Sequence, residues 1–215
     1  MLAGNIDRSR IIKRIALLSA LAFAACSPAS QDSTASARVV PAATETSAPA
    51  STATTNDALT AEGWGPLKIG MTLADVTTAL GPDSNPDAVG GPDPESCDEF
   101  RPERAPEGIL VMIQEGKLTR ISLVELSPVK TDKGLGIGDA ADTVKLAYGD
   151  AAKATPHKYQ DRPAEYITAW TGGPRSEPYV EDEAARGIVY EVDGTGKVGA
   201  VHAGGPSIQY VEGCA

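Results

Sequence analysis

A repeated segment constrains the fold of this 215-residue chain more than any other feature of its sequence. PLKIGMTLADVTTALG, at residues 66–81, aligns with GLGIGDAADTVKLAYG, at residues 134–149, at a constant offset of 68. Further along, GILVMIQEGKLTRI at residues 108–121 matches GIVYEVDGTGKVGAV at residues 187–201, with about a dozen residues inserted before the second copy. Because a repeated sequence indicates a repeated structural unit, the pattern predicts two tandem units.

Three alternate glycines open the second copy, and such a pattern can indicate a phosphate-binding loop. They are Gly134, Gly136 and Gly138, of which only Gly138 has a glycine counterpart in the first copy, Gly70. In addition, Asp139 would repel a phosphate placed at this point. We therefore interpret Gly70 and Gly138 as the turns that lead from an extended segment into a helix.

Both predicted helices have the same capping and hydrophobic pattern. Thr72 with Asp75, and Asp139 with Asp142, fit the N-cap and N3 positions of a capping box. Apolar residues then recur at helical spacing and form one stripe on each helix, and a glycine follows each stripe to end it: Leu73, Val76, Ala79, Leu80 and Gly81 in the first copy, and Ala141, Val144, Ala147, Tyr148 and Gly149 in the second.

Strand patterns follow each helix. GILVMIQ and KLTRISLV flank the turn Glu115–Gly116, and GIVYEV and KVGAVHA flank DGTG, so both copies predict a β-hairpin. In the second copy we also expect strands at EYITAW before the hairpin and at IQYVE after it. Each unit is then a helix followed by an antiparallel meander, which places the chain in the α+β class.

The helix-and-meander repeat resembles a known fold family. A glycine turn of the IGMTLADVTTALG kind, followed by an amphipathic helix and a meander, is similar to the β-lactamase-inhibitor-protein-like fold and to the small outer-membrane lipoproteins of the barrel-assembly machinery. The chain is also similar to bacterial envelope lipoproteins that end in YVEGC, here residues 210–214. The resemblance covers roughly residues 62–215, and the second copy departs from its GMT motif by reading GDA. It implies two units that share one concave sheet surface.

The N-terminus has the pattern of an export signal. Four basic residues precede the apolar run IALLSALAFAA, which is shorter than the about 20 residues that span a bilayer. The next residue is Cys26, and residues 1–25 resemble a bacterial lipoprotein signal peptide in which this cysteine would be diacylated. The resemblance implies anchoring to the outer membrane, and Ser27 after the cysteine agrees with that sorting. A secreted protein with a cysteine at this position by chance is the alternative.

Residues 26–59 are predicted to be a tether. They are rich in Ser, Thr, Ala and Pro and contain no aromatic residue, so they have too little apolar surface to compensate the entropy of ordering. We expect this segment to be disordered. The predicted organisation is thus a signal peptide at 1–25, a lipidated tether at 26–59, a first α+β unit at 60–131 and a second at 132–215.

The formal net charge of the chain is −10, and it becomes −13 when residues 1–25, which carry +3, are removed. An acidic protein repels nucleic acid, so a nucleic-acid partner is not expected. Besides Cys26 the chain has Cys97 and Cys214, and an even number of remaining cysteines in an exported chain predicts one disulfide. Two unpaired thiols are the alternative. No His or Cys lies at metal-ligand spacing beside either cysteine.

The sequence offers few residues for catalysis. The two histidines, His157 in a loop or strand start and His202 in a strand facing solvent or a partner, lie in no recognised motif. A triad of Ser207, His202 and Asp193 can be written down, but only geometry defines a triad. The segment 83–95 begins like a calcium-binding loop and then lacks its glycine and its bidentate glutamate. We therefore expect no enzyme activity, metal or cofactor.

Candidate contact residues lie near a long connection. The segment 171–186 is long for a hairpin connection, and long loops are often functional. Trp170 and Tyr179 lie beside or within it, and Trp64 precedes the first unit; aromatic residues of this kind favour protein interfaces. Trp64 and Trp170 can equally be core residues, which leaves Tyr179 as the strongest candidate for a protein contact.

Together these features predict a non-enzymatic, lipid-anchored periplasmic module that binds an envelope or secreted protein, either in envelope assembly or as an inhibitor of an exported hydrolase. A ligand-binding or catalytic lipoprotein that uses His157 or His202 is one alternative. A structural spacer at the outer membrane is another, and it predicts that an unrelated domain can replace the folded body.

Overall fold

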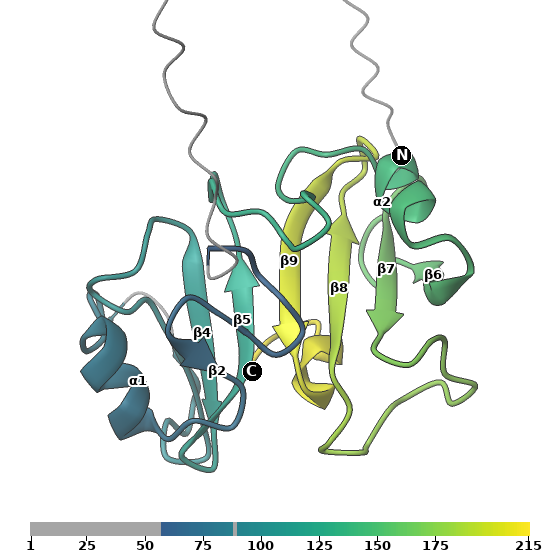
Figure 1. Ribbon diagram of the computed structural model, residues 1–215. Helices are drawn as coiled ribbons and strands as arrows, with labels where there is room; N and C mark the ends of the chain where they lie inside the picture. Colours follow the sequence, from purple (N-terminus) through teal and green to yellow (C-terminus); the bar gives the residue numbers. More distant parts are fainter. Residues whose placement is uncertain (1–56, 88–89) are drawn as a thin grey trace, which may run out of the picture. The chain divides into compact units, whose positions relative to one another are not determined.

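The computed structural model describes residues 57–87 and 90–215 (Figure 1). The predicted signal peptide, Cys26 and residues 27–56 of the predicted tether lie outside these ranges, so their predictions stand as they were made. The described residues form an α+β body with two helices and one seven-stranded antiparallel sheet. The predicted α+β class is confirmed.

The sheet has the strand order β3-β4-β5-β9-β8-β7-β6, with every neighbouring pair antiparallel. Strands β5 and β9 pair in the middle, so the two halves of the sequence form one continuous sheet (Figure 1). A two-stranded sheet, β1-β2, lies outside it. The bounds are β1 Gly63–Trp64, β2 Leu67–Lys68, β3 Cys97–Phe100, β4 Ile109–Gln114, β5 Lys117–Leu123, β6 Ala152–Pro156, β7 Glu165–Trp170, β8 Gly187–Val192 and β9 Val198–Gly204.

Both predicted hairpins are present. Glu115 and Gly116 join β4 to β5 with φ values of 48° and 72°, the positive values that a two-residue hairpin turn needs to match the twist of its strands. The second hairpin joins β8 to β9 around DGTG, and EYITAW forms β7 as predicted.

The strand predicted at IQYVE is wrong. The chain forms a 3₁₀ helix there, η2 at Pro206–Gln209, followed by turns. Strand β9 already has β5 and β8 as neighbours, so no free edge lies beside it for a following strand. Pro206 also lacks the amide hydrogen that a sheet ladder requires. The C-terminal segment therefore leaves the plane of the sheet.

The two helices differ at their N-termini. In α1, Leu73–Leu80, Thr72 and Asp75 form the predicted capping box. In α2, Ala141–Tyr148, the prediction of Asp139 as N-cap is wrong, because Ala140 occupies that position without a side-chain cap. The Asp139 carboxylate instead accepts hydrogen bonds from the Gly136 amide at 2.7 Å and from Lys130 Nζ at 3.1 Å, so it organises the preceding loop.

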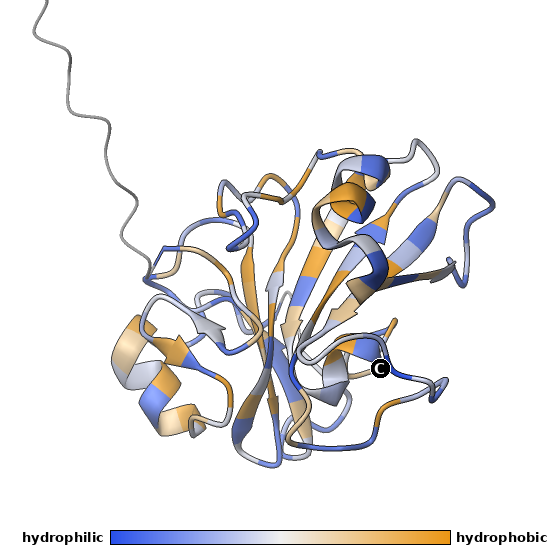
Figure 2. Ribbon diagram, turned by 45° about the vertical axis from the view of Figure 1, so that its right-hand side comes forward, coloured by the Kyte–Doolittle hydropathy of each residue, from blue (hydrophilic) through white to orange (hydrophobic). Residues whose placement is uncertain are grey.

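One face of the sheet is hydrophobic and carries both helices (Figure 2 colours the strands by hydropathy). Val76 of α1 and Val144 of α2 are fully buried against it. Tyr190 is fully buried too, and its hydroxyl group pairs with Thr131 and Tyr148 at 3.0 Å each. Its hydroxyl group is thus satisfied within the core.

Candidate functional site

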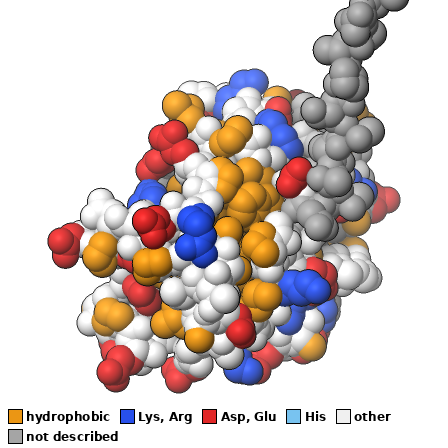
Figure 3. Space-filling model, turned by 60° about the vertical axis from the view of Figure 1, so that its left-hand side comes forward, with side chains coloured by type: hydrophobic (Ala, Val, Ile, Leu, Met, Phe, Trp, Pro, Cys, Tyr) orange, Lys and Arg blue, Asp and Glu red, His pale blue; other side chains and the backbone are white. Residues whose placement is uncertain are grey.

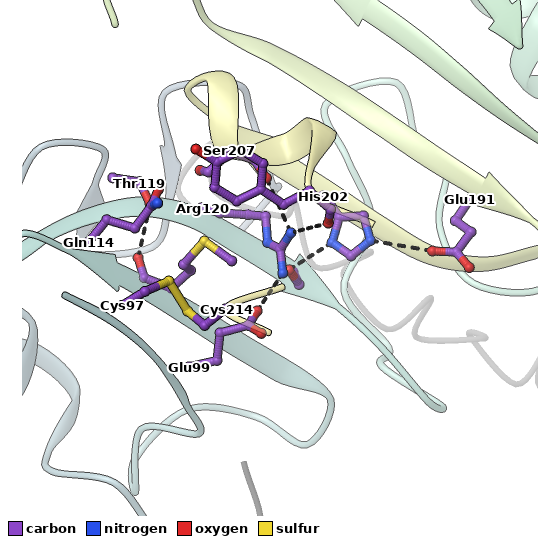
Figure 4. A network of polar contacts seen from close by, with 12 residues as sticks. Cys97, Glu99, Gln114, Thr119, Arg120, Glu191, His202, Ser207 and Cys214 are labelled. Carbon is purple, nitrogen blue, oxygen red and sulfur yellow. Dashed lines mark hydrogen bonds and ion pairs between the residues drawn. A yellow bond between two sulfur atoms is a disulfide. The ribbon is translucent and has the colours of Figure 1, made fainter. Parts of the chain in front are cut away.

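The other face of the sheet is largely polar. Side chains alternate along a strand, so the residues between the core positions of β5, β8 and β9 point away from the helices. The strand register places Ser122 beside His202, and His202 beside Val189. Arg120 lies two residues before Ser122 on β5, and Glu191 lies two residues after Val189 on β8, so both are on this face as well. Figure 4 shows the polar contacts of this face.

Arg120 fixes the C-terminal segment on this face. Arg120 is 3% exposed, and its Nη1 donates to the backbone oxygen atoms of Ser207 at 3.2 Å and Tyr210 at 2.9 Å. Its Nη2 donates to Glu99 in a short ion pair from β3. A buried guanidinium requires this kind of compensation, so the sheet and the C-terminal segment stabilise each other here.

A disulfide holds the same segment at the edge of the sheet. Cys97, the first residue of β3, is joined to Cys214, with their Cα atoms 5.5 Å apart (Figure 4). This confirms the predicted pairing over the alternative of two free thiols. Gly213 makes the approach possible, because its φ is 65° and an added Cβ would lie 2.1 Å from the Glu99 carboxylate.

The C-terminal segment and the 171–186 loop together wall a pocket over β6 to β9. The pocket has a volume of about 240 Å³. Gln209 joins the two walls, since its amide accepts from the Val180 nitrogen and donates to the Val180 oxygen, both at 2.9 Å. Trp170, 8% exposed, packs with Val180 beneath the loop. The loop is therefore attached to the body by specific contacts.

Aromatic and charged side chains line this pocket. The aromatic residues are Tyr166, Trp170, Tyr179 and Tyr210, and the charged residues are Lys153, Arg175, Glu177 and Glu191, with His202 beside them. Burial and the neighbouring Tyr210 hydroxyl raise the pKa of Tyr179 to about 12, so this phenol stays neutral. Tyr179 is 45% exposed at the rim, as is Val211 at 39%.

Glu191 lies between the two histidines. His157 Nε2 is 3.0 Å from Glu191 Oε1, and His202 Nε2 is 3.7 Å from Glu191 Oε2. His157 Nδ1 accepts from the amides of Tyr159 and Gln160, so Nε2 carries the hydrogen that is donated to Glu191. The imidazoles of His202 and His157 lower the pKa of Glu191, which keeps this carboxylate ionised.

His202 is largely shielded from solvent. Its side chain is 14% exposed, and its Nδ1 pairs with Ser122 Oγ at 2.8 Å. The C-terminal segment shields this side chain from most of the solvent, and the expectation that it faces a partner stays a prediction, since His202 lines the pocket described above. Burial and the nearby Arg120 lower the pKa of His202, so the ring is neutral.

The structure gives His202 other partners than those of the triad written from the sequence. Ser207 lies on η2, and Asp193 organises the β8–β9 turn by accepting from Thr195 and Lys197. Ser122, His202 and Glu191 do form a line of contacts. However, Ser122 is 3% exposed and does not line the pocket. A buried hydroxyl cannot reach a substrate, so this line positions the ring of His202.

The predicted contact residues fall into two groups. Tyr179 and Trp170 line the same pocket. Trp64, 9% exposed, belongs to the main core, and its Nε1 donates to the Asp57 backbone oxygen at 3.1 Å. The structure therefore brings two of the three together. Their proposed role in protein binding remains a prediction.

The described residues contain no group of three His, Cys, Asp or Glu side chains placed to hold a metal ion. At the start of segment 83–95, which begins like a calcium-binding loop, Asp83 accepts a hydrogen bond from the Asn85 amide at 3.0 Å and forms a simple turn.

In the same described ranges, neither helix has the length and hydrophobicity needed to cross a bilayer. Acidic and basic side chains are interspersed around a hydrophobic centre on the face that Figure 3 shows.

Sequence reasoning did not single out the residues that organise this face. Glu191 is the one charged residue of the strand GIVYEV, and Arg120 in KLTRISL lies between the buried residues Leu118 and Ile121. An isolated charge in such a strand is a usable signal, because it must find a partner on the sheet face. The partner itself, Glu99 on an unpredicted edge strand, gives no such signal.

No protein-family model, curated protein or solved structure matches this chain. By its fold and its site, the described part of the chain is an α+β body with an aromatic pocket on the face of an antiparallel sheet that the helices leave open.

Proposed function

We propose that this protein is a non-enzymatic, lipid-anchored binding module of the cell envelope, and that the pocket between the 171–186 loop and the C-terminal segment receives part of a partner protein. The observation that carries this proposal is the pocket itself. It opens on the polar face of the sheet, and exposed apolar side chains, Tyr179 and Val211, stand at its rim. Exposed aromatic residues at the rim of a pocket are typical of protein recognition.

The size of the pocket favours a side chain over a whole ligand. Small-molecule sites usually measure about 300–1,000 Å³, and this pocket measures about 240 Å³. Strand β6 lies at its border, with Lys153 and Thr155 among the lining residues. Because β6 is the last strand of the sheet, its outer edge is free within the described sheet. An extended segment of a partner can add to such an edge and insert one side chain into an adjacent pocket.

An envelope location fits the covalent chemistry. The Cys97–Cys214 disulfide is of the kind that persists in an oxidising compartment. It agrees with the export signal expected at residues 1–25 and with lipidation at Cys26. On this proposal the tether leads from the outer membrane to a folded body in the periplasm. Nucleic acid is not a partner.

We also propose that the body consists of two tandem units related to the β-lactamase-inhibitor-protein-like fold, with the predicted bounds 60–131 and 132–215. Matching backbone contacts support the repeat. Gly70 N donates to Leu118 O, and at the corresponding positions Gly138 N donates to Val198 O. Both hairpins also have their register shift at the same place, after Met112 and after Glu191. A repeat of this kind would arise from joining two units through their last strands, β5 and β9.

Affinity capture tests the binding function. The full-length lipidated protein is cross-linked in intact envelopes and purified, and its partners are identified by mass spectrometry. Tyr179→Ala should reduce the yield of the partner at least fivefold. Leu146→Ala, which removes a residue 85% exposed on α2, is the matched control and should leave the yield unchanged. Recovery of the protein alone, or of partners that both variants retain equally, would contradict the proposal.

A second candidate function uses the carboxylate between the histidines. Glu191 and His202 both line the pocket, so an ionised carboxylate and a neutral imidazole are available to bind or deprotonate a small ligand. This candidate predicts that replacing His157 and His202 together abolishes the envelope phenotype of the protein while the partner is still captured. An unchanged phenotype in the double variant would exclude it.

A further inference from the structure

The charged side chains in and behind the pocket differ in whether an opposite charge is paired with them. Arg120, behind the pocket, is paired with Glu99, and Arg175 at the rim lies 3.8 Å from Asp182. Among the described residues, Glu191 pairs with the imidazoles of His157 and His202, and the guanidinium of Arg120 also interacts with it electrostatically. Since the ring of His202 is kept neutral by burial, it solvates the carboxylate without cancelling its charge. Glu191 therefore presents a negative charge to the pocket.

Two further charged groups border the same space. Glu177 adds a second carboxylate from the loop, and Lys153 adds an ammonium group from the edge strand β6. Lys153 makes no salt bridge within residues 57–87 and 90–215. The four charged groups that line the pocket balance, since Lys153 and Arg175 are positive and Glu177 and Glu191 are negative. Because Arg175 is paired with Asp182, a cation is favoured beside Glu191, and Lys153 opposes a second cation near the edge strand.

The walls are suited to a cation as well. Tyr166, Trp170, Tyr179 and Tyr210 contribute four aromatic rings to the lining of one small pocket. The face of an aromatic ring attracts an ammonium or guanidinium group, and cages of several rings recognise quaternary ammonium ligands. Tyr166 is held in place by His157, whose ring stacks on it with centroids 4.7 Å apart. The ring beside Glu191 is thus fixed before anything binds.

We infer that the pocket binds the cationic side chain of one lysine or arginine in an extended segment of the partner protein, with the charged group between the aromatic rings and Glu191. This inference rests on the proposed binding function and names the chemistry that it recognises. The aliphatic part of the side chain lies against Trp170 and Tyr179, and the segment runs along β6. Because Lys153 opposes a second cation there, the preferred segment has an isolated basic residue.

A peptide titration tests this inference. The full-length protein is labelled with ¹⁵N and titrated with the peptide Gly-Ser-Thr-Lys-Thr-Ser-Gly, and the same peptide with Nε-acetyl-lysine serves as the control of nearly equal size without charge. The lysine peptide should bind at least tenfold more tightly, with shifts at the amides of residues that line the pocket. An arginine peptide should behave like the lysine peptide, and Lys-Lys-Lys in the centre should bind no more tightly than one lysine. Equal affinity for the charged and the acetylated peptide would overturn the inference.

Two variants locate the charge preference. Glu191→Gln should reduce the preference for lysine over acetyl-lysine at least tenfold, while Glu181→Gln, which changes a carboxylate outside this pocket, should leave it intact. Since Glu191 holds both histidines, its variant risks misfolding. Tyr179→Leu keeps an apolar group on an exposed loop and should weaken lysine-peptide binding about fivefold with little effect on the acetylated peptide. An unaltered preference in Tyr179→Leu and in a folded Glu191→Gln would place the cation elsewhere.

The two levels of the proposal fail in different ways. If a partner is captured through Tyr179 but the peptides show no preference for charge, the binding function stands and the cation inference is wrong. If the lysine preference is found but no protein is captured, the pocket recognises a cation in some other molecule and the protein-binding function is wrong.

Discussion

Removal of the disulfide should destabilise the protein mainly by increasing the conformational entropy of its unfolded state. The perturbation is the double variant Cys97→Ser, Cys214→Ser. The bridge spans 117 residues of sequence, and the chain-entropy model gives about 5 kcal/mol for a closed loop of that length. In the native state the C-terminal segment keeps its hydrogen bonds to Arg120 and through Gln209. Most of the lost free energy of unfolding therefore comes from the greater entropy of the unfolded chain.

The assay is urea-induced equilibrium unfolding, followed by the fluorescence of Trp64 and Trp170. With a slope of about 2 kcal/mol per molar urea, the midpoint should fall by about 2.5 M. The wild-type protein treated with dithiothreitol is the control and should give the same midpoint as the variant. The unfolding rate in high urea should change less than threefold, since the native contacts persist. A midpoint shift below about 0.5 M, or a large increase in the unfolding rate, would refute the reasoning.

Three further predictions concern the polar face. Glu99→Ala leaves Arg120 buried without its carboxylate and should lower the free energy of unfolding by about 3–5 kcal/mol, measured by urea unfolding. Gly213→Ala forces a side chain into a position with φ of 65° and against Glu99, and should cost about 1–2 kcal/mol or more, measured by the same method. For pH, burial holds the pKa of His202 below its ordinary 6.5 and the histidines hold that of Glu191 below 4.5. The free energy of unfolding should therefore be highest above pH 6.5 and fall below pH 6.5, because the histidine of the unfolded chain takes up a proton there. It should fall further below pH 4.5, where the glutamate of the unfolded chain is protonated. His202→Gln should remove much of the decrease between pH 6.5 and 5 in a series of urea midpoints from pH 8 to 5.

Matched changes show whether these effects are specific. Glu125→Ala breaks an exposed ion pair with Arg101 and should cost less than about 1 kcal/mol. Gly199→Ala places a Cβ 3.9 Å from its nearest neighbour and should be tolerated. If these controls were as destabilising as the changes at Glu99 and Gly213, the polar face would have no special role. A stability that rises as the pH falls from 7 to 5 would contradict the assignment of a neutral His202.

The sequence was informative wherever local chemistry decides the structure. The period-two pattern around Glu115–Gly116 and the strand EYITAW were predicted and are present, because turn residues and β-branched residues act over a few positions. The capping box at Thr72 was predicted for the same reason. At α2 the prediction failed, since Ala140 is the residue that corresponds to Thr72 at the offset of 68, and the carboxylate of Asp139 accepts hydrogen bonds from the Gly136 amide and Lys130.

Features that depend on distant contacts were not predictable. The sequence of IQYVE suits a strand, but its formation was prevented by the pairing of β9 on both sides. The alternation of side chains along β9 puts His202 on the face opposite the core. The C-terminal segment covers that face because Arg120 binds it through Ser207, which is 87 residues away in sequence. The pocket likewise depends on two segments, the 171–186 loop and the C-terminal segment, which are joined by Gln209 and by the neighbouring hydroxyl groups of Tyr179 and Tyr210.

Site-specific photo-cross-linking tests the proposed binding site most directly. A photoreactive amino acid is introduced at position 179, at the rim of the pocket, or at position 146, on the exposed surface of α2, and intact envelopes are irradiated. The binding proposal predicts one abundant cross-linked protein from position 179, competed by the lysine peptide, and none from position 146. Absence of a cross-link at position 179, or the same products from both positions, would contradict it.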